Sequence, residues 1–149
     1  IFRGEIEQTA KMIRKAYDNG VRILSGSESG FALTPYGHWH AREMQVFVED
    51  LGLTPVEAIE TATKNGAWAM QLDDQLGTLE VGKLADLLII DGDPIADISI
   101  LNDKTKINTI ISRGEQVDLD SLWPSHEPIA GWKVGNWANE ILTWDKAYE

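Results

Sequence analysis

The segment that starts the chain constrains the fold more than any other part, because it places a helix, a turn, a strand and a loop in direct succession. Apolar residues recur at helical spacing over residues 5–19. Gly20 follows where a left-handed residue ends a helix, and the β-branched run 21–24 is typical of a buried strand. The small-residue loop 25–30 comes next, with one acid, Glu28, near its centre. This order is typical of an α/β protein with parallel strands.

Two further helices are predicted downstream of a polar and aromatic stretch. The first has an apolar face made by Met44, Phe47, Val48 and Leu51, and Gly52 ends it. The residues from Thr54 to Glu57 form a capping box with proline at the first helical position, which predicts a helix start. Helical apolar spacing then continues over residues 58–62 and resumes near residues 67–70.

After residue 76 the pattern changes from helices to short strands and turns. Residues 77–83 are rich in turn formers, and residues 85–90 form an apolar run that predicts a strand. The turn 91–94 ends that strand, and residues 107–117, with Arg113-Gly114 between two β-prone runs, predict a hairpin. We therefore expect a separate β region in this part of the chain.

These patterns divide the chain into three parts. Residues 1–76 form the α/β part, residues 77–118 the β part, and residues 119–149 a tryptophan-rich tail. The tail contains Trp123, Trp132, Trp137 and Trp144, four of the six tryptophans. Two interpretations of the tail stay open: indoles that cover apolar surface of the body, or a strip that docks another subunit or a missing part of the chain.

Composition and charge exclude several classes of function. The 149 residues include 24 acidic and 13 basic side chains, and the net charge of −11 disfavours nucleic acids and anionic membranes as partners. There is no cysteine, which excludes disulfides and thiolate metal sites. No apolar run approaches the roughly 18 residues of a membrane helix. Because residues 1–10 do not look like a signal peptide, we expect a cytoplasmic protein.

Three stretches in this order resemble the C-terminal part of the metal-dependent amidohydrolase superfamily, in its imidazolonepropionase-like and dipeptidase-like branch. They are residues 20–30, 53–67 and 76–94. The resemblance implies a (β/α)8 TIM-type barrel with a small flanking β-sandwich. A complete barrel takes about 250 residues, so we expect a fragment of a larger fold. Residues 1–76 would then be the last α/β units of the barrel, and residues 77–118 part of the sandwich.

The resemblance also implies a divalent metal, with zinc as the expected ion. The other metal ligands of the family, a His-x-His and further His or Lys residues, have no counterpart in this chain. Glu28 lies where the family has a catalytic Asp that contacts the metal and accepts a proton from the attacking water. Glutamate is longer by one carbon, about 1.5 Å. The alternative is an ordinary exposed loop glutamate.

The sequence His38-Trp39-His40 could line a substrate pocket, serve packing or bind metal. In the resembling branch the loop after the last barrel strand helps to form the substrate pocket, so Tyr36 and these three residues are candidate substrate-binding residues. As a metal site, His38 and His40 would share one face of a strand. Glu43 is interpreted as a first-turn acid that favours its helix.

Four other polar residues receive structural interpretations. Ser27 and Ser29 lack the G-x-S-x-G context of a nucleophile, so they would let the loop turn or hold Glu28. Lys83 and Asp86 suit turn formation and strand pairing better than catalysis.

The sequence therefore predicts the C-terminal segment of an amidohydrolase that hydrolyses a C–N bond through metal-activated water, inactive as a separate chain. Its substrate would be a small amide, cyclic amide or dipeptide-like molecule. Its partner would be the missing N-terminal barrel portion or a complementary subunit, and a homo-oligomer is possible. The alternative is a non-catalytic binding or assembly module that retains part of the fold.

Overall fold

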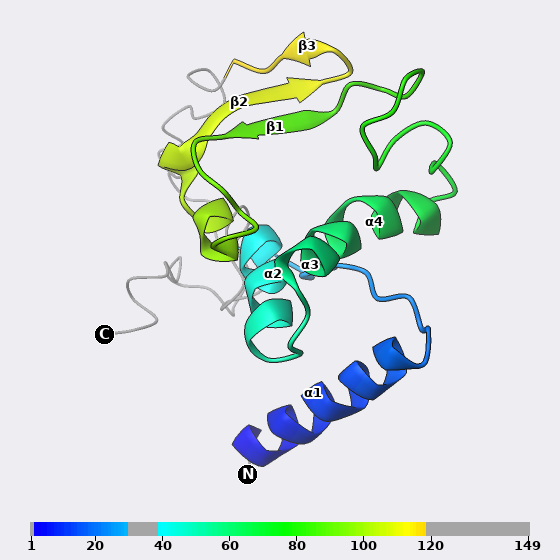
Figure 1. Ribbon diagram of the computed structural model, residues 1–149, viewed down its shortest axis with the longest axis vertical. Helices are drawn as coiled ribbons and strands as arrows, with labels where there is room; N and C mark the ends of the chain where they lie inside the picture. Colours follow the sequence, from blue (N-terminus) through cyan, green and yellow to red (C-terminus); the bar gives the residue numbers. More distant parts are fainter. Residues whose placement is uncertain (1, 30–38, 119–149) are drawn as a thin grey trace, which may run out of the picture.

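The computed structural model describes residues 2–29 and 39–118, in which helices are followed by a small sheet (Figure 1). The helices are α1 (Phe2–Asp18), α2 (Trp39–Glu49), α3 (Pro55–Ala62) and α4 (Lys64–Ala69). The strands are β1 (Leu87–Ile90), β2 (Ile107–Ser112) and β3 (Glu115–Gln116), with the 3-10 helices η1 (Ile98–Asn102) and η2 (Lys104–Lys106) between β1 and β2. The predicted helices, the strand within residues 85–90 and the hairpin are confirmed. Among the described helices, none has the length and hydropathy needed to cross a bilayer.

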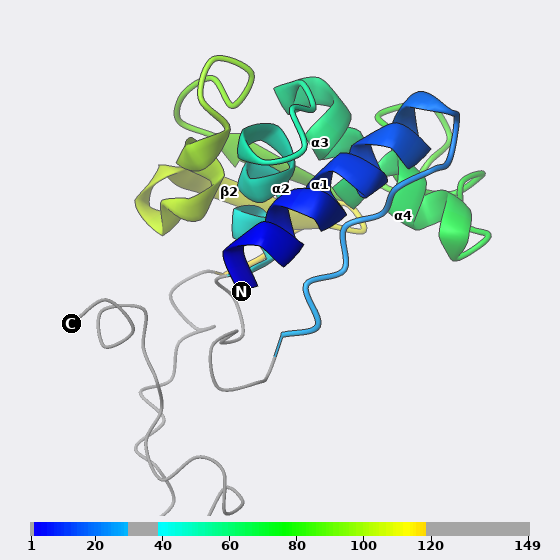
Figure 2. The same cartoon turned by 90° about the horizontal axis from the view of Figure 1, so that it is seen from below.

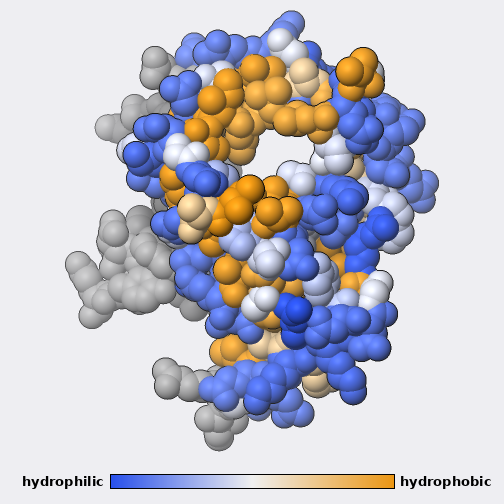
Figure 3. Space-filling model, in the orientation of Figure 1, coloured by the Kyte–Doolittle hydropathy of each residue, from blue (hydrophilic) through white to orange (hydrophobic). Residues whose placement is uncertain are grey.

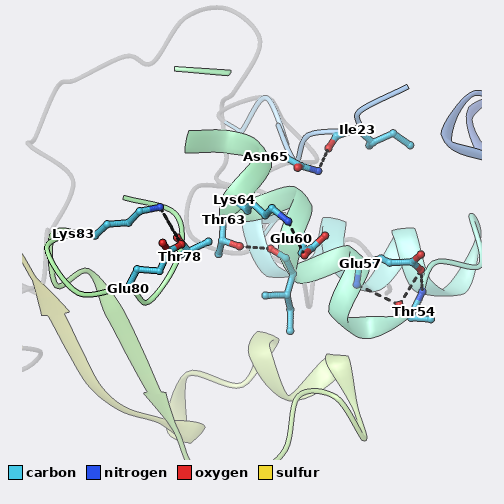
Figure 4. Close-up of polar contacts among 11 residues, drawn as sticks. Ile23, Thr54, Glu57, Glu60, Thr63, Lys64, Asn65, Thr78, Glu80 and Lys83 are labelled. Carbon is cyan, nitrogen blue, oxygen red and sulfur yellow. Dashed lines mark hydrogen bonds and ion pairs between the residues drawn. The ribbon is translucent and has the colours of Figure 1, made fainter. Parts of the chain in front are cut away.

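The start of α3 is the capping box that the sequence predicts. The Thr54 side chain accepts a hydrogen bond from the backbone N–H of Glu57 at 3.3 Å, and the Glu57 carboxylate accepts from the backbone N–H of Thr54 at 2.7 Å. These reciprocal bonds satisfy two N–H groups that a helix start leaves without partners. Figure 4 shows the pair at the beginning of the helix.

Replacing Thr54 with Ala is expected to lower the free energy of unfolding by about 1 kcal/mol at neutral pH. Hydrogen bonds from the Thr54 backbone, the Thr54 side chain and Tyr17 hold the pKa of Glu57 below its ordinary value of 4.5. Ionised Glu57 therefore stabilises the fold, and this contribution is lost as the pH falls through the lowered pKa. Urea unfolding should show a smaller difference between wild type and Thr54→Ala in acid than at neutral pH.

The control for this prediction is Thr63→Ala. The Thr63 hydroxyl donates to the carbonyl of Ile59 at 2.8 Å, a bond with no titratable partner. The change in unfolding free energy caused by Thr63→Ala should therefore be the same whether Glu57 is ionised or protonated. If Thr54→Ala lowers the free energy of unfolding equally in acid and at neutral pH, the expected dependence on the ionisation of Glu57 is contradicted.

Helix α1 is joined to the turn between α2 and α3 by polar contacts. The Arg14 guanidinium donates to the carbonyl of Gly52 at 2.6 Å and to the carbonyl of Leu51 at 3.4 Å. Figure 2 shows α1 passing in front of α2 and α3. Apolar side chains on α1 stay exposed, with 62% of Ile6 and 65% of Met12 accessible. The described residues thus leave part of this helix uncovered.

The predicted strand 21–24 does not form, and this prediction is wrong for the described structure. The segment is extended but pairs with no strand, and Val21 is 55% exposed. A strand requires a neighbouring strand that completes its hydrogen bonds, and residues 2–29 and 39–118 place none beside it. The sheet that the described residues do form is antiparallel, so α and β content is confirmed and parallel pairing is not.

The sheet has the order β1-β2-β3, with Leu87 opposite Ile111 and Leu88 opposite Ile110. The Asp86 carboxylate accepts the backbone N–H of Arg113 at 2.6 Å, which ties the start of β1 to the β2–β3 turn. The predicted role of Asp86 in turn formation and strand pairing is thereby confirmed.

Both faces of the sheet are apolar, and both are partly uncovered. Leu88 is 53% exposed and its neighbour Ile89 is 46% exposed, although successive residues of a strand point to opposite faces. Figure 3 shows apolar atoms gathered over the strands at the top of the molecule. By contrast, the buried apolar set among the described residues is small and comes from the connection between α2 and α3, from α3 and α4, and from η1: Leu51, Leu53, Ala58, Ala67 and Ile98. The described part therefore has the character of a unit of a larger fold.

The loop between α4 and β1 is closed by Lys83. Its ammonium group donates to the carbonyl of Asp73 at 2.7 Å and to the Thr78 hydroxyl at 2.6 Å, and it lies 3.3 Å from the Glu80 carboxylate. Figure 4 shows Lys83, Thr78 and Glu80 together at this turn. The turn-forming role predicted for Lys83 is confirmed. The division of the chain at residue 76 stays a prediction, and the tail 119–149 lies outside the described residues.

Candidate functional site

The loop that bears Glu28 follows an extended segment anchored to α3 and α4. The Asn65 side chain donates to the carbonyl of Ile23 at 2.9 Å (Figure 4), and the backbone N–H of Ser25 donates to the carbonyl of Thr61 at 3.2 Å. Thr61 is fully buried, so this second anchor belongs to the core. The segment is thus fixed at two points immediately before the loop begins.

The Glu43 carboxylate on α2 provides two more contacts to the same loop. The Ser25 hydroxyl donates to Oε2 of Glu43 at 2.6 Å, and the backbone N–H of Gly26 donates to the same oxygen at 2.8 Å. Such bonds to a carboxylate are stronger than neutral ones. Glu43 therefore binds both the side chain and the backbone of the loop.

The interpretation of Glu43 as a first-turn acid is wrong, because α2 begins at Trp39 and Glu43 lies in its second turn. One sequence signal could have indicated its role. A Gly- and Ser-rich loop exposes backbone N–H groups, and an acid on the next helix is a natural acceptor for them.

His40, in the first turn of α2, contacts the same loop at Ser27. Its Nδ1 atom lies 3.2 Å from the Ser27 hydroxyl, which is 2.8 Å from the Ser29 hydroxyl. Ser27 and Ser29 thus bond to each other, and Ser27 also bonds to His40, as expected of residues that shape a loop. The alternative of two histidines on one face of a strand is wrong for His40, which is helical.

The four candidate substrate-binding residues divide between described and undescribed parts of the chain. Trp39 opens α2 and is half-buried, and His40 is exposed. Tyr36 and His38 lie outside the described residues. The pocket predicted for this set stays a prediction.

Glu28 itself has an unusual backbone and an exposed side chain. Its φ is +46°, in the left-handed region that a residue with a Cβ adopts at a cost of about 1–3 kcal/mol and that is enriched at functional sites. Among residues 2–29 and 39–118, no side chain or backbone group forms a hydrogen bond or ion pair with its carboxylate. The loop is held tightly around a carboxylate that stays accessible.

The described residues do not complete a metal centre. Within residues 2–29 and 39–118 there is no group of three or more His, Asp or Glu side chains that could hold an ion. Catalytic zinc usually takes three protein ligands. Glu28 can supply one carboxylate, so the other ligands would have to come from elsewhere.

Helices, an extended segment with an acid-bearing loop, and a sheet with uncovered faces define this chain as part of a larger α/β protein. Residues 4–117 match the model of the Amidohydrolase family. The chain therefore belongs to the amidohydrolase family, which confirms the resemblance that residues 20–30, 53–67 and 76–94 predict.

Relatives and solved structures agree with this assignment. The chain is 36% identical over 101 residues to an imidazolonepropionase of Brevibacillus brevis, a match that covers 68% of this chain and 24% of the relative. A Xaa-Pro dipeptidase crystallised with bound methionine is similar in structure, with a TM-score of 0.65, 35% identity, and coverage of 73% and 25%. Phenylurea hydrolase B gives a TM-score of 0.64 at 31% identity, with coverage of 72% and 26%. The chain spans about a quarter of the length of these proteins.

Proposed function

We propose that this chain is the C-terminal part of a metal-dependent amidohydrolase that hydrolyses a C–N bond in a small amide, cyclic amide or dipeptide-like substrate. The observation that carries the proposal is the anchored loop with an exposed carboxylate at Glu28. The names of the relatives support the class of bond, since they include an imidazolonepropionase, a Xaa-Pro dipeptidase and a phenylurea hydrolase.

The proposed architecture is the end of a (β/α)8 barrel with part of its flanking β-sandwich. Two features of the described residues support it. The extended segment 21–24 has the residues of a buried strand but no neighbour, and the sheet from β1 to β3 is apolar on both faces. The remaining strands would come from the rest of the polypeptide or from a complementary subunit. We call this chain together with those remaining strands the assembled enzyme.

In the proposed mechanism Glu28 moves a proton. A bound divalent ion, expected to be zinc, supplies the Lewis acidity that lowers the pKa of water. The Glu28 carboxylate accepts a proton from the attacking water and delivers it to the leaving nitrogen. Barrel enzymes keep such groups in the loops at the carboxyl ends of their strands, which is where the loop 25–29 would lie. Tyr36, His38, Trp39 and His40 would shape the substrate pocket.

The mass of the native assembly, measured together with its metal content, tests this proposal. We expect a complex larger than the 16.6 kDa chain that contains zinc or a similar ion in stoichiometric amount. The complex should hydrolyse imidazolonepropionate or an Xaa-Pro dipeptide such as alanyl-proline. A metal-free species at the mass of the chain would contradict the proposal and favour a binding or assembly module.

A further inference from the structure

We propose that Glu43 is a positioning residue, which fixes the loop 25–29 and thereby the place of the Glu28 carboxylate. The proposal rests on the function proposed for Glu28. Glu43 on α2 thus holds a loop that lies 17 and 18 positions before it in the sequence.

The first argument is the position of the contact within the loop. The upstream anchors fix the carbonyl of Ile23 and the backbone N–H of Ser25. Gly26 comes next, and a Cβ built on it would meet no atom within 4 Å, so packing does not restrain it. Glycine is the residue with the greatest backbone freedom. The bond from its N–H to Glu43 at 2.8 Å therefore restrains the chain two residues before Glu28.

The second argument is that α2 is held independently of this contact. Helix α2 packs against α3 and η1, and its Gln45 accepts a hydrogen bond from Asn102 at 2.9 Å. Loss of the Glu43 carboxylate should release the loop without releasing the helix. Its effect should therefore fall on the geometry of the loop more than on the stability of the protein.

Substitutions of Glu43 can distinguish a side chain that positions the loop as a hydrogen-bond acceptor from one that acts through its negative charge. Both hydrogen bonds end on the same oxygen, Oε2 of Glu43. A glutamine at this position retains one carbonyl oxygen, which can accept both bonds, whereas leucine accepts neither at a similar size. If Glu43 acts as an acceptor that positions the loop, Glu43→Gln should be tolerated and Glu43→Leu should not.

The experiment compares these two variants in the assembled, zinc-loaded enzyme. Hydrogen–deuterium exchange of the peptide covering residues 25–29 reports the loop, and hydrolysis of alanyl-proline or imidazolonepropionate reports catalysis. For Glu43→Leu we expect lost protection of the loop amides and a kcat lowered roughly ten- to hundredfold, the size of effect that supporting residues usually have, with little change in KM. Glu43→Gln should restore both protection and kcat.

Glu49→Leu provides the matched control, because Glu49 lies on the same helix and pairs with Arg42 and Gln45 rather than with the loop. It should leave both measurements unchanged. Unaltered exchange in Glu43→Leu would overturn the proposal, and so would an equal loss of kcat in the Gln and Leu variants. If the wild-type assembly hydrolyses neither probe, the function proposed for Glu28 fails, while exchange still decides whether Glu43 holds the loop.

Discussion

Glu28→Gln in the assembled enzyme is expected to lower kcat by about 10²- to 10⁴-fold, the usual contribution of a general acid–base residue. The amide is nearly the same size as the carboxylate but cannot accept a proton from water. Because the side chain is exposed and bonds to no other described residue, the substitution should leave the fold and the assembly unchanged. Steady-state hydrolysis and native mass, measured on the same preparation, check both parts of this expectation.

Two further variants sharpen the test. Glu115→Gln removes a carboxylate from exposed strand β3 and should leave kcat unchanged. Glu28→Asp installs the residue that the resemblance implies for this position and shortens the side chain by about 1.5 Å. We expect it to retain turnover. A Glu28→Gln enzyme with wild-type kcat would show that this carboxylate takes no part in the reaction.

Gly77→Ala is expected to lower the free energy of unfolding by roughly 2–5 kcal/mol. Gly77 has a φ of +91°, and a left-handed backbone costs a residue with a Cβ about 1–2 kcal/mol. The new Cβ would also lie 2.5 Å from the Cβ of buried Ala67 and 3.2 Å from the carbonyl oxygen of Thr63. Both atoms are fixed to the helical backbone, so overpacking adds a further 1–3 kcal/mol or so. Denaturant unfolding measures the loss.

Gly82→Ala separates the two contributions. Gly82 has nearly the same backbone, with a φ of +94°, but a Cβ there would meet no atom within 4 Å. Its substitution should cost only the backbone part, about 1–2 kcal/mol. Equal destabilisation by the two variants would show that the approach of Gly77 to Ala67 contributes nothing.

Local features of the fold could be predicted from the sequence because their causes are local. The capping box at Thr54 and the hairpin turn at Arg113-Gly114 depend on residues a few positions apart, and the structure confirms both. The strand 21–24 could not be predicted in the same way. Its apolar, β-branched residues describe a buried strand, but the ladder that makes a strand depends on neighbours that the described residues do not contain.

The candidate site shows the same contrast between local and distant causes. Glu28 could be proposed from the sequence because its loop of small residues resembles the loop after the last barrel strand of the family. For Glu43 the sequence indicates only that the Gly- and Ser-rich loop needs an acceptor, and which acid supplies it depends on contacts between residues 17 and 18 positions apart. The packing of α2 decides which oxygen accepts each hydrogen bond. The helical periodicity of the sequence does not predict that packing.

The exposed strand β1 has a consequence for how this protein must be made. Strand β1 lies at the edge of the described sheet and consists of four apolar residues, Leu87–Ile90. When this edge is uncovered, its free backbone groups can pair with the same strand of another molecule. Exposed aspartates flank β1 on both sides: Asp86, which accepts the backbone N–H of Arg113, and Asp91, which lies 3.5 Å from the Lys106 ammonium group. Stacking such strands in register would bring the like-charged carboxylates of neighbouring copies together, so we expect Asp86 and Asp91 to disfavour aggregation until the sheet is covered.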